Sequence, residues 1–289
     1  MLNNLDLEKF SFLSSQDILD FKNKYFGSIF VIKYGGAAMK NDNLKYKVIQ
    51  DLVFLHSLGI HLILVHGGGP FINDWLLKLN IKPQFNDGIR VTDHTTMEVV
   101  EMVLSGKINK ELVGLLSTFN VSAIGLSGKD SNLITASPLF NSLNNYVGKI
   151  ESINNKILNL LLQSNYIPVL ASIGLDSSNN TYNINADTVA SSIAISMNAK
   201  KLVLLTDISG IMLDINDNST LLKQLNLSTV NQLKANNTIY GGMIPKVDCC
   251  INALLSNIDS THIIDGRVEH ALLYEMLTPA RLGSMIVLD

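Results

Sequence analysis

FVIKYGG, at residues 30–36, is an apolar run that ends in a lysine and two glycines. The pattern returns further along the chain as LILVHGGGP, at residues 62–70. Each stretch has the pattern of a buried strand that runs into a glycine turn, and such a turn exposes backbone N–H groups to an anion, usually a phosphate or a carboxylate. The first turn also has a fixed positive charge beside it. The two turns therefore predict an anion-binding site where two strands end.

Apolar runs alternate with helical patterns along the rest of the chain. We expect strands at 29–34, 62–66, 123–126, 167–172, 202–206, 262–264 and 284–288. We expect helices between them at 43–57, 71–79, 95–119, 156–164, 187–197, 229–235, 242–256 and 269–277. Several strands are almost entirely Val, Ile and Leu, which indicates burial on both faces. The sequence therefore predicts an α/β fold with a mostly parallel sheet.

Three segments depart from this alternation. Some or all of residues 1–27 are predicted to form an amphipathic helix, with Gly27 as its stop. This helix either packs on its own domain or docks onto another subunit. Residues 85–92 and 131–153 predict hairpins or loops inserted over the edge of the sheet, where lids often form. The segment at 181–187 is a candidate boundary between two lobes.

The composition restricts the classes of protein to which the chain can belong. It has 289 residues, 47% of them hydrophobic, which is enough for a large core in one domain or two lobes. The net charge is −3 and no segment is rich in arginine, so we expect no nucleic-acid partner. The adjacent Cys249 and Cys250 predict two buried thiols rather than a disulfide framework or a metal site.

The sequence also gives an expectation for the compartment. No apolar stretch is long enough to span a membrane, and the first residues resemble neither a signal peptide nor a transit peptide. We therefore expect no membrane partner and a cytoplasmic location. The abundance of Asn, Ile and Lys is typical of AT-rich coding, and an organelle-encoded chain would work in the plastid stroma.

Lys33 stands at the end of the first expected strand, at the edge where open α/β sheets bind ligands. It would neutralise phosphoryl oxygens, although a surface lysine that caps a strand is the simpler interpretation of Lys-x-Gly-Gly alone. The second turn is more specific, because Gly67-Gly68-Gly69 is followed by Pro70, which suits a first helical turn. Neither turn has the spacing of a P-loop or of a Rossmann fingerprint, so both classes are disfavoured.

Two further stretches carry side chains that suit an anion site. Arg90 could hold a carboxylate with its guanidinium fork, or it could form a surface salt bridge. Asn183, Asn185 and Asp187 alternate along the chain, so in an extended segment they face the same side. They could converge on one ligand or on two lysines, and Asn185 or Asp187 could cap the helix that follows.

A second lysine repeats the opening pattern. GGMIPK, at residues 241–246, places Lys246 beside a glycine-rich helix start, and TDISG, at 206–210, follows another apolar strand as a candidate nucleotide loop. Two positive charges with N–H donors suit a phosphoryl group in transfer, because its transition state needs positioning and charge neutralisation more than covalent help. The six histidines show no metal-ligand spacing, and we interpret His66 as structural.

Together these stretches resemble the amino acid kinase family, and within it the branch that phosphorylates N-acetyl-L-glutamate. The matching pieces are KYGG at 33–36, HGGGP at 66–70, DGIRVT at 87–92, YNINAD at 182–187, TDISG at 206–210 and GGMIPK at 241–246. The resemblance implies a three-layer αβα sandwich with a mostly parallel, open central sheet. It also implies a helical extension at 1–27, a lobe at 28–182 that binds acetylglutamate and forms dimers, and a lobe at 183–289 that binds ATP and an effector.

The same resemblance implies roles for individual residues. The catalytic residues would be Lys33, Lys246 and Asp187, with the carboxylate orienting the lysines. The acetylglutamate contacts would be Gly68, Gly69, Arg90, Asn183 and Asn185. The ATP contacts would be Gly35, Gly36, Thr206, Asp207, Ser209, Gly210, Gly242 and Met243. ATP would arrive as Mg-ATP, with no protein-bound metal or prosthetic group, and would phosphorylate a carboxylate that needs no general base.

The stretch at 270–285 and the N-terminal extension resemble the arginine-sensitive plant, algal and cyanobacterial type. This implies inhibition by L-arginine bound at His270, Glu275 and Gly283, a homohexamer built as a trimer of dimers, and the PII signalling protein as a partner of some members. Arg281 departs from the pattern that we expect in that loop. The alternatives are a glutamate 5-kinase, an aspartate kinase, or a non-catalytic sensor of arginine or nucleotide, although the presence of both lysines argues against a sensor.

Overall fold

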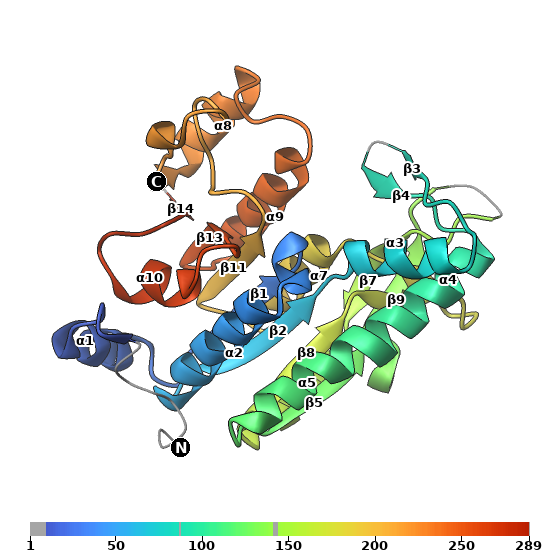
Figure 1. Ribbon diagram of the computed structural model, residues 1–289, viewed down its shortest axis with the longest axis horizontal. Helices are drawn as coiled ribbons and strands as arrows, with labels where there is room; N and C mark the ends of the chain where they lie inside the picture. Colours follow the sequence, from blue (N-terminus) through green and yellow to red (C-terminus); the bar gives the residue numbers. More distant parts are fainter. Residues whose placement is uncertain (1–9, 87, 141–143, 289) are drawn as a thin grey trace.

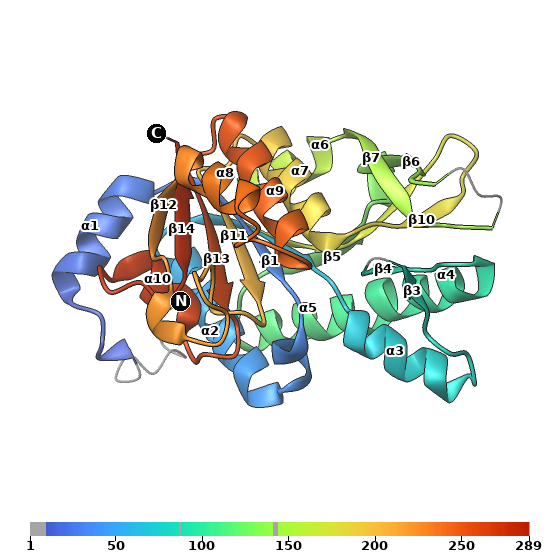
Figure 2. The ribbon, with the colours of Figure 1, turned by 90° about the horizontal axis from the view of Figure 1, so that it is seen from above.

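A computed structural model of the chain describes residues 10–86, 88–140 and 144–288. Its central sheet has eight strands, which lie in the order β12 (Gln224–Asn226), β14 (Ser284–Val287), β13 (Ser260–Asp265), β11 (Lys201–Thr206), β1 (Ile29–Tyr34), β2 (His61–His66), β8 (Ile167–Ala171) and β5 (Ala123–Ser127) (Figure 1, Figure 2). All neighbouring pairs are parallel except β13 and β14. The predicted, mostly parallel sheet is confirmed. Because β1, β2 and β11 are parallel neighbours, the turns that follow them lie at one edge.

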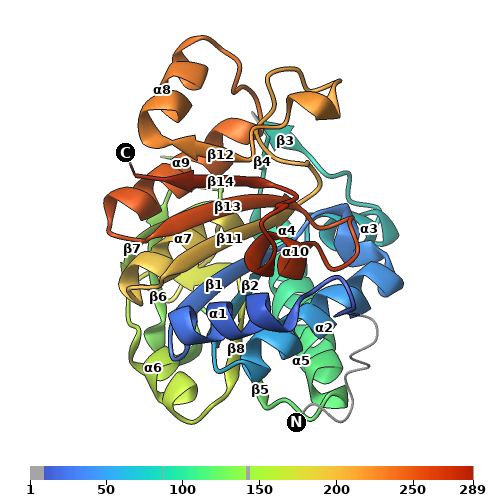
Figure 3. The ribbon, with the colours of Figure 1, turned by 90° about the vertical axis from the view of Figure 1, so that its left-hand side faces the viewer.

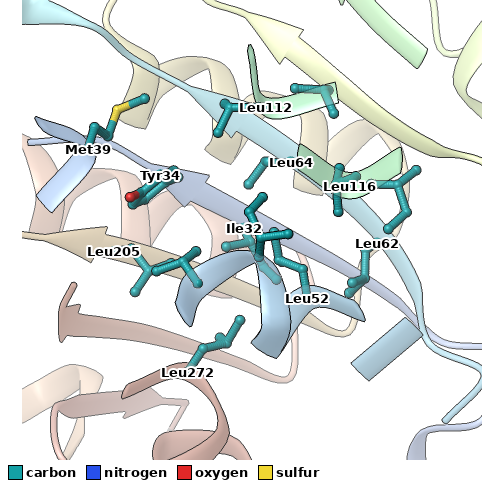
Figure 4. Close-up of a cluster of buried hydrophobic side chains, with 14 of the residues drawn as sticks. Ile32, Tyr34, Met39, Leu52, Leu62, Leu64, Leu112, Leu116, Leu205 and Leu272 are labelled. Atoms are coloured by element: carbon teal, nitrogen blue, oxygen red, sulfur yellow. The ribbon is translucent and has the colours of Figure 1, made fainter. Parts of the chain in front are cut away.

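Helices cover both faces of this sheet and complete three layers (Figure 3). One face carries α2 (Asp42–Ser57), α5 (Asn109–Thr118) and α10 (Ala271–Leu277), and the other carries α6 (Lys156–Gln163), α7 (Ala186–Ser196), α8 (Leu227–Ala235) and α9 (Met243–Leu255). Successive residues of a strand point to opposite faces. Ile32 and Leu64 therefore pack in the first core, which Figure 4 shows, while Val31 and Ile63 pack in the second. All four are fully buried, and burial of such a side chain contributes about 1.5–3 kcal/mol.

Smaller sheets extend one end of the molecule. A second sheet has the order β10 (Thr181–Asn183), β9 (Ile173–Leu175), β6 (Ile134–Pro138) and β7 (Gly148–Ile153), and β3 (Phe85–Asn86) pairs with β4 (Ile89–Arg90). The hairpins expected at 85–92 and 131–153 are confirmed. Figure 2 shows β6, β7 and β10 at the same end as α3 (Gly69–Lys78) and α4 (His94–Glu101). Strands β9, β10 and β12 were not predicted, because each has three residues and none has a long apolar run.

The single helix predicted over 95–119 is wrong in its middle. Helix α4 begins after Asp93, whose side chain accepts a hydrogen bond from the first turn. Residues Met102–Ile108 then form a π-helix before α5 begins. Ser105 and Gly106 lie in this segment, and both residue types weaken an α-helix. The apolar residues spaced three or four apart stay buried through the change from α- to π-helix, namely Met97, Val100, Leu104, Ile108 and Leu112. Their spacing alone therefore did not reveal the π-helix.

A helix forms within the N-terminal extension, as predicted, and it packs on its own domain. Helix α1 spans Ser15–Tyr25, and part of the expected extension lies at 1–9, outside the described residues. Phe21 meets Phe30 of β1 edge to face, with 6.0 Å between ring centroids. Phe10 precedes the helix and is 4% exposed in the first core. Among the described residues, no helix combines the length and the apolar character that a membrane span requires.

Candidate active site

A buried carboxylate joins two lysines at the carboxyl edge of the central sheet. The strand alternation points Lys33, on β1, to the face that carries α7, and Asp187 lies in the first turn of α7. Lys246 reaches the same carboxylate from α9. Nζ of Lys33 lies 2.9 Å from Oδ1 of Asp187, and Nζ of Lys246 lies 2.7 Å from Oδ2. The fold thus brings together the three residues to which the resemblance assigns catalysis.

The electrostatics of this cluster favour an anion. Burial, the largest influence, would raise the pKa of Asp187, but the ammonium groups of Lys33 and Lys246 together outweigh it and lower that pKa to about 2. The carboxylate is therefore ionised at neutral pH and neutralises one of the two lysines. The side chains of Lys33 and Lys246 are only 9% and 17% exposed. One positive charge remains in excess where water screens it weakly.

The first glycine turn leaves room for the Lys33 ammonium group. A Cβ on Gly35 would lie 2.8 Å from Nζ of Lys33, so the lysine occupies the space that a side chain would need. Gly36 has a φ of +81°, a conformation that favours glycine, and it lies against Asp207, with 3.6 Å from its ideal Cβ position to Cβ of that residue. The first turn therefore contacts both the lysine and the candidate nucleotide loop.

The second glycine turn lies beside the first turn of α7. The ideal Cβ position of Gly67 is 3.5 Å from Cβ of Ala186, the residue before the buried carboxylate. Gly68 is the N-cap of α3, and a Cβ there would lie 2.4 Å from Ile108 and 2.6 Å from Leu104, both in the π-helical segment. The backbone of this turn is therefore held close to its neighbours and to the lysine cluster.

Arg90 is a buried guanidinium with no carboxylate within salt-bridge distance among the described residues. Burial lowers its pKa to about 10, so it remains charged at neutral pH. Nη2 donates to the carbonyl of Gly69 at 3.2 Å and to Oδ1 of Asn73 at 2.6 Å, while the described residues offer Nη1 no acceptor. The ring of Phe85 lies 4.8 Å from the guanidinium carbon. The open Nη1 and the bond to the Gly69 carbonyl place a buried cationic donor next to the second glycine turn.

A small cavity of about 80 Å³ adjoins Arg90 and is lined by Asn86, Ile89, Arg90, Val91, Phe140 and Asn145. Asn183 joins this region, because its Nδ2 donates at 3.3 Å to Oγ1 of Thr92, which donates to the Arg90 carbonyl. Asn185 caps α7, with its Oδ1 2.8 Å from the N–H of residue 187. Thr92 and Asn73 were not predicted as site residues, although the position of Asn73 one helical turn after Gly69 was a usable signal.

A larger cavity of about 280 Å³ opens beside Lys246. It is lined mainly by apolar residues from two segments, 207–215 and 238–246. Four of the predicted ATP contacts line it, namely Asp207, Gly210, Gly242 and Met243. The other four, Gly35, Gly36, Thr206 and Ser209, do not. The wall formed by 238–240 was not predicted, although the tyrosine before Gly241-Gly242 was a signal for a surface that could contact a flat base.

The residues predicted to bind an effector already have hydrogen-bond partners within the chain. Glu275 is 3% exposed, and its Oε1 lies 2.8 Å from Nδ1 of His262. Its Oε2 accepts from the N–H of Gly283 at 3.0 Å. His270 has a different partner, with Nδ1 2.5 Å from Oδ1 of Asp51. Glu275 and Gly283 are therefore in direct contact, with both carboxylate oxygens of Glu275 already engaged.

Comparison with known proteins shows the family to which the chain belongs. The model of the amino acid kinase family matches residues 28–265, which is most of the chain. The chain belongs to the amino acid kinase family. A family member from the alga Gracilaria tenuistipitata var. liui, an acetylglutamate kinase, is 57% identical over 289 residues and covers the whole of both chains. The acetylglutamate kinase of Thermosynechococcus vestitus is 49% identical over 271 residues, 94% of this chain and 92% of that protein. The resemblance drawn from the sequence is confirmed.

Solved structures confirm the fold of this amino acid kinase family member. N-acetylglutamate synthase from Neisseria gonorrhoeae, complexed with coenzyme A and N-acetyl-glutamate, superposes with a TM-score of 0.83 at 22% identity, over 95% of this chain and 62% of that one. Carbamate kinase from Giardia lamblia bound to AMP-PNP gives a TM-score of 0.67 at 15% identity, over 91% of this chain and 99% of that one. At these identities the likeness concerns the fold alone.

Proposed function

We propose that this chain transfers the γ-phosphoryl group of ATP to the side-chain carboxylate of N-acetyl-L-glutamate, giving N-acetyl-L-glutamyl 5-phosphate in arginine biosynthesis. Full-length relatives named acetylglutamate kinase, 57% and 49% identical, support the reaction. The observation that carries the chemistry is the Lys33–Asp187–Lys246 cluster, which lies between two glycine turns and beside a cavity.

The chemistry follows from the charges at this cluster. An oxygen of the substrate carboxylate attacks the γ-phosphorus, the bond to the β-bridging oxygen breaks, and ADP leaves with that electron pair. The nucleophile is already ionised, so the reaction requires no base. In our proposal Lys33 and Lys246 neutralise the phosphoryl oxygens, and Asp187 holds their ammonium groups in place. N–H groups of Gly68 and Gly69 supply further donors.

The two cavities suit the two substrates. Arg90, with its open Nη1, would hold the free carboxylate of acetylglutamate, while Asn183 lines the same region. The cavity beside Lys246 would take the nucleotide, whose base suits its apolar lining. Membership of a kinase family implies the use of ATP. No group of three or more metal-ligating side chains occurs in the described residues, and we propose that Mg²⁺ enters with ATP.

An acceptor panel tests the proposed reaction. The protein is incubated with Mg-ATP and hydroxylamine, which converts an acyl phosphate to a coloured hydroxamate, and with acetylglutamate, glutamate or aspartate in turn. We expect hydroxamate from acetylglutamate only. Product from glutamate or aspartate alone would instead indicate a glutamate 5-kinase or an aspartate kinase. A sensor without catalysis would give no product from any acceptor.

Replacing one lysine tests the site independently of the acceptor. Lys246→Ala should lower turnover by about 10²-fold or more, because donors that stabilise transition-state charge are worth that much. The matched control is Lys200→Ala, which removes an exposed lysine 3.3 Å from Asp259 and should leave turnover unchanged. Unchanged turnover in Lys246→Ala would show that the cluster is not the active site.

Regulation and assembly extend the proposal. We propose feedback inhibition by arginine near Glu275 and Gly283, whose contact would have to open to admit a guanidinium group. We further propose lobes at 28–182 and 183–289, a hexamer made of three dimers, PII as a partner, and a location in the cytoplasm or the plastid stroma. Exposed Leu19 on α1 is available for contact with another subunit. Deletion of residues 1–25 should give dimers by light scattering, and a truncated hexamer would exclude α1 as the linker.

A further inference from the structure

A buried pair of polar side chains lies beneath the second glycine turn. His66 ends β2 and is 0% exposed, and Asn109 begins α5 and is 1% exposed. Nδ2 of Asn109 lies 3.1 Å from Nε2 of His66, and Nδ1 of His66 lies 3.1 Å from the carbonyl oxygen of Gly67. The pair therefore links the start of α5 to the backbone of the turn. A buried polar network of this kind needs an explanation beyond packing.

The contacts of Asn109 determine which way its amide faces. Its Nδ2 also lies 2.8 Å from the carbonyl oxygen of Val169 and 3.3 Å from that of Leu126. Two carbonyl acceptors require a donor between them, so this atom is the nitrogen. The amide group has only two N–H donors, and the closest of its three contacts are the Val169 carbonyl and Nε2 of His66. Because an amide nitrogen accepts no hydrogen bond, Nε2 of His66 must be the unprotonated nitrogen that accepts. The ring consequently carries its proton on Nδ1 and donates it to Gly67, and burial keeps the ring neutral by lowering the pKa to about 4.

The hydrogen bond from His66 controls the orientation of one peptide group. In a trans peptide the carbonyl of one residue and the N–H of the next point in opposite directions. With the Gly67 carbonyl held toward the ring, the N–H of Gly68 points away from it. The N–H of Gly67 is also held, because it donates to the carbonyl of Tyr34 at 3.0 Å. No acceptor among the described residues takes the N–H of Gly68, so it is available to a ligand.

The peptide between Gly67 and Gly68 lies close to the lysine cluster. Gly67 lies against Ala186, the residue that precedes the buried carboxylate. Side chains of the π-helical segment, Ile108 and Leu104, lie 2.4 Å and 2.6 Å from the ideal Cβ position of Gly68. Rotation of the peptide would break the hydrogen bond to His66, and π-helical turns often lie at functional sites.

We propose that His66 is a positioning residue, held in one tautomer by Asn109, which turns the N–H of Gly68 toward the phosphoryl group in transfer. The proposal rests on the proposed function, since it requires transfer at the lysine cluster. In this proposal the rate of phosphoryl transfer depends on which nitrogen of the His66 ring carries the proton. A purely structural histidine would need only its shape and its polarity.

Two substitutions separate these roles. His66→Asn places an amide nitrogen near the position of Nδ1 and preserves the donor to Gly67. His66→Gln reaches the position of Nε2 and preserves the contact with Asn109, but leaves no donor at Nδ1. We expect His66→Gln to lower kcat by about tenfold or more, as for a lost oxyanion donor, with KM for both substrates nearly unchanged. His66→Asn should retain most of kcat. Equal kcat values in the two variants would overturn the proposal.

A second measurement uses the unaltered protein and does not depend on the folding of a variant. In ¹⁵N-histidine-labelled protein, NMR distinguishes the protonated from the unprotonated ring nitrogen. We expect Nδ1 of His66 to carry the proton from about pH 6 to pH 8. A proton on Nε2 would contradict the proposal. If the unaltered protein gives hydroxamate from acetylglutamate while the two variants have equal kcat, the proposed function stands and this inference fails.

Discussion

Replacing Asp187 with Asn tests whether the carboxylate holds the two lysines for catalysis. The substitution keeps the size of the side chain and removes the charge that lies 2.9 Å from Lys33 and 2.7 Å from Lys246. Two ammonium groups would then face each other across a neutral amide in a buried site, where like charges repel strongly. We expect Lys246 to turn toward solvent, because its side chain is the more exposed of the two.

The effect on stability follows from the pKa of Asp187, which is lowered from 3.8 to about 2. Since one pKa unit corresponds to about 1.4 kcal/mol, the ionised carboxylate stabilises the fold by about 2 kcal/mol relative to its protonated form. This contribution is fully present above about pH 4 and is lost as the pH falls through about 2, because only the ionised form is stabilised. The Asn variant should therefore be less stable at neutral pH, and its stability should change less between these pH values.

Two assays at fixed protein concentration measure these effects. Urea unfolding at about pH 7 and about pH 3 should show that the deficit of the variant shrinks in acid. The hydroxamate assay should show a loss of kcat of about 10²-fold or more. Asp259→Asn is the control, because it removes an exposed ion pair with Lys200. Wild-type turnover in Asp187→Asn, or an equal deficit at both pH values, would refute the reasoning.

Three further substitutions probe other parts of the site. Arg90→Met should raise KM for acetylglutamate by about tenfold or more without changing KM for ATP, because a charged hydrogen bond is worth about 1.5–3 kcal/mol; steady-state kinetics with each substrate checks this. Gly68→Ala should lower kcat, because its Cβ would lie 2.4 Å from a side chain of the π-helical segment, whereas Gly69→Ala, with open space around its Cβ, should be tolerated in the same assay. Gly210→Ala should lower the free energy of unfolding by about 1–3 kcal/mol in urea titrations, since Gly210 has a φ of +144° and its Cβ would lie 2.6 Å from Oγ of Ser284.

The elements that the sequence predicted well are those buried on both faces. Strand β1 was predicted at its observed bounds, because an unbroken apolar run has few other ways to be buried. The three-residue strands β9, β10 and β12 are held by pairing with neighbours rather than by their own composition, so no local pattern marks them. The π-helical segment Met102–Ile108 escaped prediction for a related reason, since both helix types keep the same side chains buried.

The site was predictable to the extent that it depends on local periodicity. The strand period places Lys33 on the face of α7, and the cap at Asn185 fixes where α7 begins and hence where Asp187 points. The cavity beside Lys246 is formed instead by two separate segments, 207–215 and 238–246, and no single segment encodes how they come together. The tautomer of His66 depends on carbonyl groups from two further strands, so it could only come from coordinates.

The charges of the site explain why it would attract anions. Lys33, Lys246 and Arg90 are three largely buried cations, and Asp187 is the carboxylate that pairs with two of them. Leaving a buried charge unpaired costs stability, so these positions are poor choices for the fold alone. Bound carboxylate and phosphate groups would supply the missing negative charge. In the proposed reaction, the same imbalance that lowers the stability of the empty protein favours the two anionic substrates, and most of all the transition state, in which their charges would meet between the lysines.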